Sequence, residues 1–243
     1  MGNWSVNRLR PRAVLQQLLL DGDVDELLEM AGMIHGHYCP GLALGVKAVE
    51  AAFRHLGIDD NTGMEEIMAV AECNSCFVDG IQFAAGCTLG NNGLVYKDLG
   101  KTAATFYRRG GAEAVRVSVK TYDFTSGSEE ERREGDELFE KAVKRRETLS
   151  HTESARMKEL WTKRSFETVK MTDDELFTIT TVPEPRISFA PIMDSQECSV
   201  CGESVMESKA VFRNGKAVCL SCAAEEYRMV AGKGISTAKA VAG

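Results

Sequence analysis

The sequence predicts an α+β fold in which an antiparallel-rich sheet packs with helices, followed by a small C-terminal zinc ribbon. Three observations lead to this class. Apolar residues recur at helical spacing over much of residues 12–57, and they alternate at strand spacing over residues 102–122. The eight cysteines fall into two groups of four, separated by 110 residues without cysteine. Paired C-x2-C spacings in a reducing compartment favour metal or redox chemistry over a disulfide framework.

Helices are expected first along the chain. Residues 12–33 are predicted to be helical with a break in the middle, because Asp23 can cap a second helix that carries Glu26 at its third position. Another helix begins at Pro40, a residue suited to the first helical position, and stops at Gly57. One apolar stripe runs along this helix, so one of its faces is expected to be buried.

Short strands are expected next. Residues 67–71 (IMAVA) predict a buried strand, and residues 77–85 predict a helix. Residues 102–109 and 114–122 predict two strands that are joined through two glycines. We therefore expect an antiparallel hairpin in this part of the chain.

A charged helical region follows. Residues 128–177 are predicted to form helices with capping boxes at Ser150 and Thr172, and their charges are interpreted as a solvated helix face. Residues 177–182 predict a last strand. The expected domains are a core at 1–185 with its motifs at 35–105, a proline-containing linker at 186–196, the zinc ribbon at 197–230 and a disordered tail at 231–243.

The composition limits the classes of partner. The formal net charge is −7, so nucleic acid gains no general electrostatic attraction and is not expected as a partner. No apolar run approaches the roughly 20 residues that a membrane helix needs. No small-residue cleavage site follows the basic N-terminus. We expect a cytoplasmic protein that does not contact a membrane.

The C-terminal cysteine group has the spacing of a zinc ribbon. The pairs Cys198-x2-Cys201 and Cys219-x2-Cys222 are separated by 17 residues. Four thiolates complete a tetrahedral zinc site with bonds of about 2.3 Å. A module of roughly 30 residues cannot build a sufficient hydrophobic core without a bound metal ion of this kind. We expect one structural zinc ion per chain at this position.

The N-terminal group mixes cysteines with histidines. Cys39 in HGHYCPG is expected at a helix N-terminus, where backbone N–H groups favour a thiolate. Cys73 and Cys76 suit either a metal chelate or a thioredoxin-like redox pair, whereas Cys87 could equally be a small core residue. A mixed set can leave a coordination position open for chemistry. The candidate ligands of a second metal ion are His35, His37, Cys39, Cys73, Cys76 and Cys87.

Two segments resemble a known family. HGHYCPGLALGVKAVEA and ECNSCFVDGIQFAAGCTLGNNGLVYKDLGKTAATF are similar to the E-subunit family of molybdenum/tungsten formylmethanofuran dehydrogenase. The resemblance covers roughly residues 25–185, and the ribbon matches an appendage of many members. It implies a homodimer with an α+β core and a groove that can hold a metal ion. The motif positions are His35, His37, Cys39, Cys73, Cys76, Asp79, Cys87 and Lys101.

The resemblance also implies an accessory role. The family is named after a complex that reduces CO2 onto methanofuran, and other subunits of that complex carry the molybdopterin and iron–sulfur chemistry. This sequence has no signature for those cofactors. We predict a metal-binding accessory protein whose candidate partners are the subunits of an oxidoreductase complex. The core metal is expected to be zinc, and nickel or iron would also fit a soft ligand set.

Three alternatives stay open. In a stand-alone zinc enzyme the metal would hold water. The catalytic candidates are Cys39, Asp79 or a free histidine as general base, and Lys101 as the binder of an anionic substrate. A thiol redox protein would work through Cys73 and Cys76. A regulator would bind protein or nucleic acid through the ribbon. No Ser/His/Asp order, P-loop or dinucleotide fingerprint supports the common hydrolase, NTPase or dehydrogenase classes.

Overall fold

The computed structural model describes residues 8–121 and 127–240, and the chain divides into two compact units between Ile187 and Ser188. We call residues up to Ile187 the core unit and those from Ser188 the ribbon unit. Within the described residues, no helix has both the length and the apolar character needed to cross a membrane.

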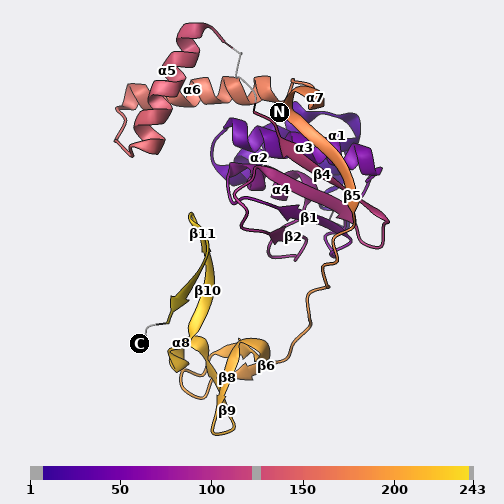
Figure 1. Cartoon of the computed structure of the whole chain (residues 1–243), viewed down its shortest axis with the longest axis vertical. Helices are drawn as coiled ribbons and strands as arrows, with labels where there is room; N and C mark the ends of the chain where they lie inside the picture. The colour runs from indigo at the N-terminus through magenta and orange to yellow at the C-terminus, as the bar shows by residue number, and fades with distance from the viewer. Residues whose placement is uncertain (1–7, 122–126, 241–243) are drawn as a thin grey trace. The chain divides into compact units, whose positions relative to one another are not determined.

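Four helices of the core unit lie on one side of its sheet (Figure 1). The third and fourth pack on the strands, and the first and second pack on other helices of this group. Asp23 caps the second helix, since its carboxylate accepts a hydrogen bond from the backbone N–H of Glu26 at 3.1 Å. The third helix begins after Cys39 with Pro40 in its first position and ends at Gly57 in the left-handed conformation. These are the caps that the sequence predicts. The helices are α1 (Ala13–Asp21), α2 (Val24–His35), α3 (Pro40–Leu56) and α4 (Cys76–Ala85).

The sheet has five strands in the order β2-β1-β3-β4-β5. The β1–β2 pair is parallel and the other three pairs are antiparallel. The α+β class with an antiparallel-rich sheet is therefore confirmed, although the sequence did not predict the three-residue edge strand β2. The strands are β1 (Ile67–Ala71), β2 (Leu94–Tyr96), β3 (Ala103–Arg108), β4 (Glu113–Val119) and β5 (Phe177–Pro183).

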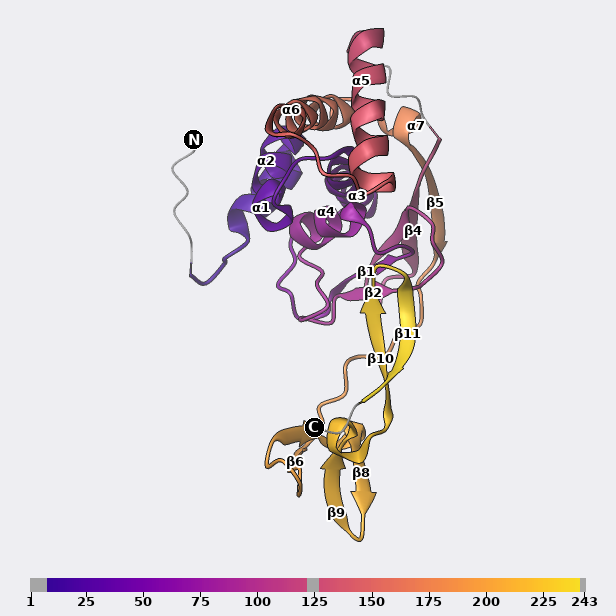
Figure 2. The same cartoon turned by 90° about the vertical axis from the view of Figure 1, so that its left-hand side faces the viewer.

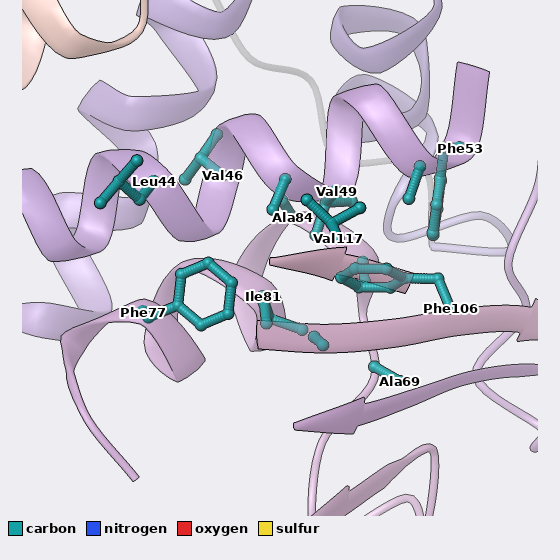
Figure 3. Packing of buried hydrophobic residues seen from close by; sticks show 14 of the residues in the cluster. Leu44, Val46, Val49, Phe53, Ala69, Phe77, Ile81, Ala84, Phe106 and Val117 are labelled. Atoms are coloured by element: carbon teal, nitrogen blue, oxygen red, sulfur yellow. The ribbon is translucent and has the colours of Figure 1, made fainter. Parts of the chain in front are cut away.

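Helix α3 lies at the centre of the core. Its buried face contributes Val46, Val49 and Phe53, and the ring of Phe53 meets that of Phe106 on β3 edge-on at 6.4 Å between centroids (Figure 3). Each large apolar side chain that is fully buried in this way stabilises the fold by about 1.5–3 kcal/mol. Helix α3 also packs directly on α4, which brings the N-terminal ends of both helices together and positions the residues discussed below.

The charged region forms a helical arm on the core unit (Figures 1 and 2). Capping boxes are present at Ser150 and Thr172, as predicted. Ion pairs join the two long helices of the arm: Arg156 with Glu134, Lys163 with Glu131 and Arg164 with Asp136. The elements are α5 (Glu129–Phe139), the π-helical turn η1 (Glu140–Lys144), α6 (His151–Thr168) and α7 (Asp173–Leu176).

The ribbon unit consists of short two-stranded sheets around its cysteines. Its last hairpin corrects the expectation that residues 231–243 are disordered, because β11 pairs with β10 over six residues. A two-residue turn at Gly232-Lys233 permits this hairpin, and residues 241–243 lie outside the described part. The elements are β6 (Ser195–Glu197), β7 (Ser204–Met206), η2 (Glu207–Lys209), β8 (Ala210–Arg213), β9 (Lys216–Cys219), α8 (Leu220–Ala223), β10 (Glu226–Ala231) and β11 (Gly234–Lys239).

A buried glutamate that pairs with a partly exposed arginine gives the core unit a pH-dependent stability. Arg116 on β4 donates two hydrogen bonds to the carboxylate of Glu72, at 2.6 and 2.9 Å, and Glu72 is only 7% exposed. These bonds lower the pKa of Glu72. A carboxyl group with a depressed pKa stabilises the fold above its unfolded pKa, and this contribution is lost as pH falls through the folded pKa.

We expect Glu72→Gln to lower the free energy of unfolding by about 1.5–3 kcal/mol at neutral pH, because a charge-assisted bidentate pair becomes a neutral contact. The difference from the wild type should shrink as pH falls below the unfolded value of about 4.3, and it should vanish only below the lowered folded pKa of Glu72, where both states protonate the glutamate. Urea unfolding of both proteins, from neutral to acidic pH, measures this difference in the free energy of unfolding. Glu113→Gln, at an exposed position of β4, is the control and should have little effect. A Glu72→Gln difference that is constant with pH would contradict this account.

Candidate metal centre

The loop between α2 and α3 gathers three potential ligands. His35 is the last residue of α2, and Gly36 ends the helix in the left-handed conformation with φ of 86°. The chain can therefore reverse within four residues, so that Cys39 caps α3. The ligand atoms of His35, His37 and Cys39 all lie within 4.8 Å of one another. This is close enough for one metal ion to contact all three.

Asp79 fixes the orientation of His35. The Nδ1 atom of His35 lies 2.7 Å from a carboxylate oxygen of Asp79, which stands in the first turn of α4. The Nε2 atom of the same ring faces Cys39, with 3.6 Å between Nε2 and Sγ. A carboxylate on one ring nitrogen leaves the other nitrogen free as a metal ligand, and this is the usual support of metal-binding histidines.

Cys76 brings a second thiol to Cys39. The two residues stand at the N-terminal ends of α4 and α3, where backbone N–H groups and the helix dipole favour negative charge. Hydrogen bonding with Cys39 lowers the pKa of Cys76 to about 6, with His35 acting in the same direction. The same hydrogen bond, together with burial, raises the pKa of Cys39. Cys76 is therefore the first of the pair to ionise.

His37 forms the exposed side of the cluster. Its ring lies 4.4 Å from that of His35 and 5.8 Å from that of Trp161, measured between centroids. Burial lowers the pKa of His37, and the neighbouring His35 and Lys158 act in the same direction. The imidazole is therefore neutral at neutral pH, which is the form that binds metal ions.

Two of the predicted cysteines lie apart from this cluster. Cys87 is fully buried, and its Sγ lies 3.3 Å from the carbonyl oxygen of Ile67 and 3.9 Å from the amide nitrogen of Asn61. Burial raises the pKa of Cys87 to about 12. The Sγ of Cys73 lies 3.4 Å from the hydroxyl of Ser75. Neither cysteine belongs to the group formed by His35, His37 and Cys39, and the burial of Cys87 agrees with the alternative that it is a small core residue.

Asp79 contacts the cluster of potential ligands, whereas Lys101 makes its contacts elsewhere. Lys101 donates its backbone N–H to the carbonyl oxygen of Glu72 at 3.0 Å, and its exposed side chain lowers the pKa of the Glu72 carboxyl group. Within residues 8–121 and 127–240, no hydrogen bond joins Lys101 to the cluster. Asp79 does belong to it, through the contact with His35. Of the two polar candidates, only Asp79 contacts a potential ligand.

A cavity of about 750 Å³ opens beside His37, and its far wall comes from α6. That wall includes Met157, Lys158 and Trp161. The sequence places Met157 and Trp161 in an apolar helix stripe, which indicates burial but not a cavity. Nothing in the sequence connects α6 with a loop more than 100 residues earlier, so these site residues could not be predicted.

The ribbon unit carries a second cluster with a regular geometry. The sulfur atoms of Cys198, Cys201, Cys219 and Cys222 all lie within 4.8 Å of one another, with 4.0 Å between those of Cys201 and Cys219. Tetrahedral zinc with bonds of about 2.3 Å places its sulfurs about 3.8 Å apart. The backbone N–H of Cys219 points at the sulfur of Cys198 at 3.3 Å. This donor set fits one zinc ion, as the sequence predicts.

Comparisons with known proteins agree with the four-cysteine cluster of the ribbon unit. Residues 193–228 match the prokaryotic dksA/traR C4-type zinc finger. A protein of Archaeoglobus fulgidus named "Probable S-adenosyl-L-methionine-binding protein" is 38% identical over 212 residues, which is 86% of this chain but 55% of the relative. The chain thus spans about half the length of that relative.

A solved structure has the same fold. It is a tungsten formylmethanofuran dehydrogenase FmdE-like protein from Syntrophus aciditrophicus, with a TM-score of 0.53 and 20% identity over 82% of this chain and 91% of that one. Residues 34–178 match the family described as FmdE, molybdenum formylmethanofuran dehydrogenase operon. These residues contain the whole His/Cys cluster, and the match confirms the resemblance seen in the motifs. The chain belongs to the FmdE family and carries a C4-type zinc finger after the family domain.

Proposed function

We propose that the core unit binds one transition metal ion through His35, His37 and Cys39, with Cys76 as the fourth donor. The convergence of three ligand atoms within 4.8 Å carries this proposal. The carboxylate of Asp79 on His35 supports it, because that contact presents the Nε2 atom to the cluster. Two imidazoles and two thiols form a soft donor set that suits zinc, and also nickel or iron.

The protein then acts as a metal-binding accessory protein with two different sites. The four-cysteine site of the ribbon unit is structural in this account, since its four sulfurs would complete the tetrahedral coordination of a zinc ion. The core site stands beside a cavity through His37, so a bound ion there would lie close to small molecules. Such an ion would supply Lewis acidity. The residues around it would keep the metal-binding side chains in position and would limit the access of other molecules to the ion. Homodimer formation and association with the subunits of an oxidoreductase are further proposals that rest on the family resemblance.

Metal content tests the core site. Elemental mass spectrometry of the full chain should give two metal ions per chain for the wild type and one for Cys39→Ser. Serine is a good N-cap, so it can replace the contact of Cys39 with the backbone N–H of Leu42. The variant should therefore stay folded while it loses a soft ligand.

Cys87→Ser is the matched control, because Cys87 is also buried in the core unit but lies apart from the cluster. It should keep two metal ions. Retention of both ions by Cys39→Ser, with normal folding, would contradict the ligand assignment. A single ion in the wild type would show that the core site is vacant.

The other functions have weaker geometric support. The carboxylate of Asp79 is engaged by His35, so in this arrangement it is not free to act as the general base of a stand-alone enzyme. The contacts of the two cysteines of the predicted redox pair are with other residues, because Cys76 hydrogen-bonds with Cys39 and Cys73 contacts Ser75. The proximity of Cys39 and Cys76 agrees better with a shared metal ion.

The name of the Archaeoglobus relative introduces S-adenosyl-L-methionine as a candidate ligand of this chain. The cavity beside His37 could offer Trp161 to the adenine ring. However, no aspartate or glutamate among the described residues lines the cavity to meet the sulfonium and ammonium charges of that ligand. Charge therefore favours a different class of molecule.

A further inference from the structure

The cavity beside His37 has the size and lining of a small-molecule site. Its volume of about 750 Å³ falls within the range of roughly 300–1,000 Å³ that is typical of ligand pockets. One wall belongs to the loop of His37 and Tyr38, and the opposite wall belongs to α6. Because His37 is both a wall residue and a ligand of the proposed metal ion, a molecule in the cavity would lie against the metal centre.

Trp161 supplies an aromatic surface inside this cavity. Its indole is partly buried and lies between the rings of His37 and Phe139, at centroid distances of 5.8 and 6.0 Å. Met157 adds a polarisable thioether one turn earlier on α6. Flat aromatic molecules gain most from such a lining, because they can stack on the indole and contact the sulfur.

The charge of the cavity comes from one side chain. Lys158 lines it, whereas no acidic residue of the described chain does. Arg156, Lys163 and Arg164 of the same helix are all paired with carboxylates of α5. Lys158 has no carboxylate partner within residues 8–121 and 127–240. Its ammonium group is therefore available to a ligand. Ser154 and Thr162, whose side chains carry hydroxyl groups, line the same cavity.

We propose that this cavity binds a planar organic anion, with its ring on Trp161, its carboxylate, sulfonate or phosphate group on Lys158, and one edge against the metal-binding His37. This inference extends the proposed function. It rests on the proposed metal site only for the role that the bound molecule would have next to the metal ion. The binding itself depends only on the cavity. Failures of the two proposals can therefore be told apart.

The test uses two dyes that differ in charge. The probe 8-anilinonaphthalene-1-sulfonate carries a sulfonate, and N-phenyl-1-naphthylamine has the same rings without it. Of the two tryptophans in the sequence, Trp4 lies outside the described residues, so the full chain is used with Trp4→Phe. Energy transfer from Trp161 then gives the strongest signal for dye bound near the cavity, because transfer falls steeply with distance.

We expect saturable binding of the sulfonate and a loss of about tenfold or more in affinity with Lys158→Met, because a charge-assisted contact disappears. Lys170→Met, which removes an exposed lysine beyond the end of α6, is the matched control and should bind like its parent. The neutral dye should not respond to either change. Excess S-adenosyl-L-methionine should not displace the sulfonate.

Equal sulfonate affinity in Lys158→Met and Lys170→Met would overturn the inference, as would equal affinity for both dyes. Displacement by S-adenosyl-L-methionine would assign the cavity to that ligand instead. The same titration on Cys39→Ser separates the two proposals. If Cys39→Ser holds no core metal but still binds the sulfonate in a way that depends on Lys158, the proposal for the cavity is supported. The metal site is then tested separately by the metal content of the chain.

Discussion

Replacing Cys198 with serine is expected to unfold the ribbon unit and to leave the core unit intact. The ribbon unit has little apolar core of its own: its buried cluster, among the residues that the structure describes, contains only Cys198, Val218 and Ala223. Structural zinc sites contribute apparent binding free energies of about 10–16 kcal/mol, far more than so small a core can replace. Removing one of four ligands should therefore remove the main source of stability in this unit.

Hydrogen exchange followed by mass spectrometry measures the effect segment by segment. Amides in β8 and β9 should lose their protection in Cys198→Ser, whereas those in α3 and β1 should keep theirs. Ser199→Ala alters the neighbouring residue without touching a ligand and serves as the control, with wild-type protection throughout. Persistent protection of β8 and β9 in Cys198→Ser would show that zinc is not what holds the ribbon unit together.

Replacing Gly45 with alanine should destabilise the core unit strongly. A Cβ atom at this position would overlap the carbonyl oxygen of Phe77 and would lie 3.0 Å from the Cα of Gly80. Both neighbours are backbone atoms of α4, so a side-chain rotation cannot relieve the clash. Overpacking of this kind costs about 1–3 kcal/mol or more, although alanine itself favours a helix by about 1 kcal/mol.

The same substitution should also weaken the core metal site. Separating α3 from α4 moves Cys39, at the start of α3, away from Cys76, at the start of α4. Urea unfolding and a competitive zinc titration measure the two effects. Gly90→Ala is the matched control, because only the Thr88 hydroxyl lies within 4 Å of its added Cβ, at an ordinary 3.8 Å. Wild-type stability in Gly45→Ala would contradict the close packing of the two helices.

The sequence predicts those parts of the fold that depend on neighbouring residues. The limits of α3 follow from Cys39, Pro40 and Gly57, which lie at its ends. The strand β2 was missed because three residues carry no periodic signal, and its parallel pairing with β1 depends on the tertiary fold. The hairpin β10–β11 was missed because small and polar residues in its second strand are typical of tails.

The residues of the candidate site also differ in whether the sequence alone could predict them. His35, His37 and Cys39 could be predicted together since they share one short loop. Asp79 is expected from the sequence to act as a base, and only the fold shows that its carboxylate is engaged by His35. Lys158 and Trp161 enter the site from a distant helix, so no spacing rule could associate them with it.

X-ray absorption at the zinc edge of the full, zinc-loaded chain tests the central claim most directly, because it counts sulfur and nitrogen ligands. The wild type should show a mixture of sulfur and nitrogen ligands, since the spectrum averages the four-sulfur site with the proposed His/Cys site. Cys39→Ser should hold one zinc ion per chain and give a spectrum with sulfur ligands alone. An all-sulfur spectrum in the wild type, or identical spectra and zinc contents in the two proteins, would contradict a metal ion bound by His35, His37 and Cys39.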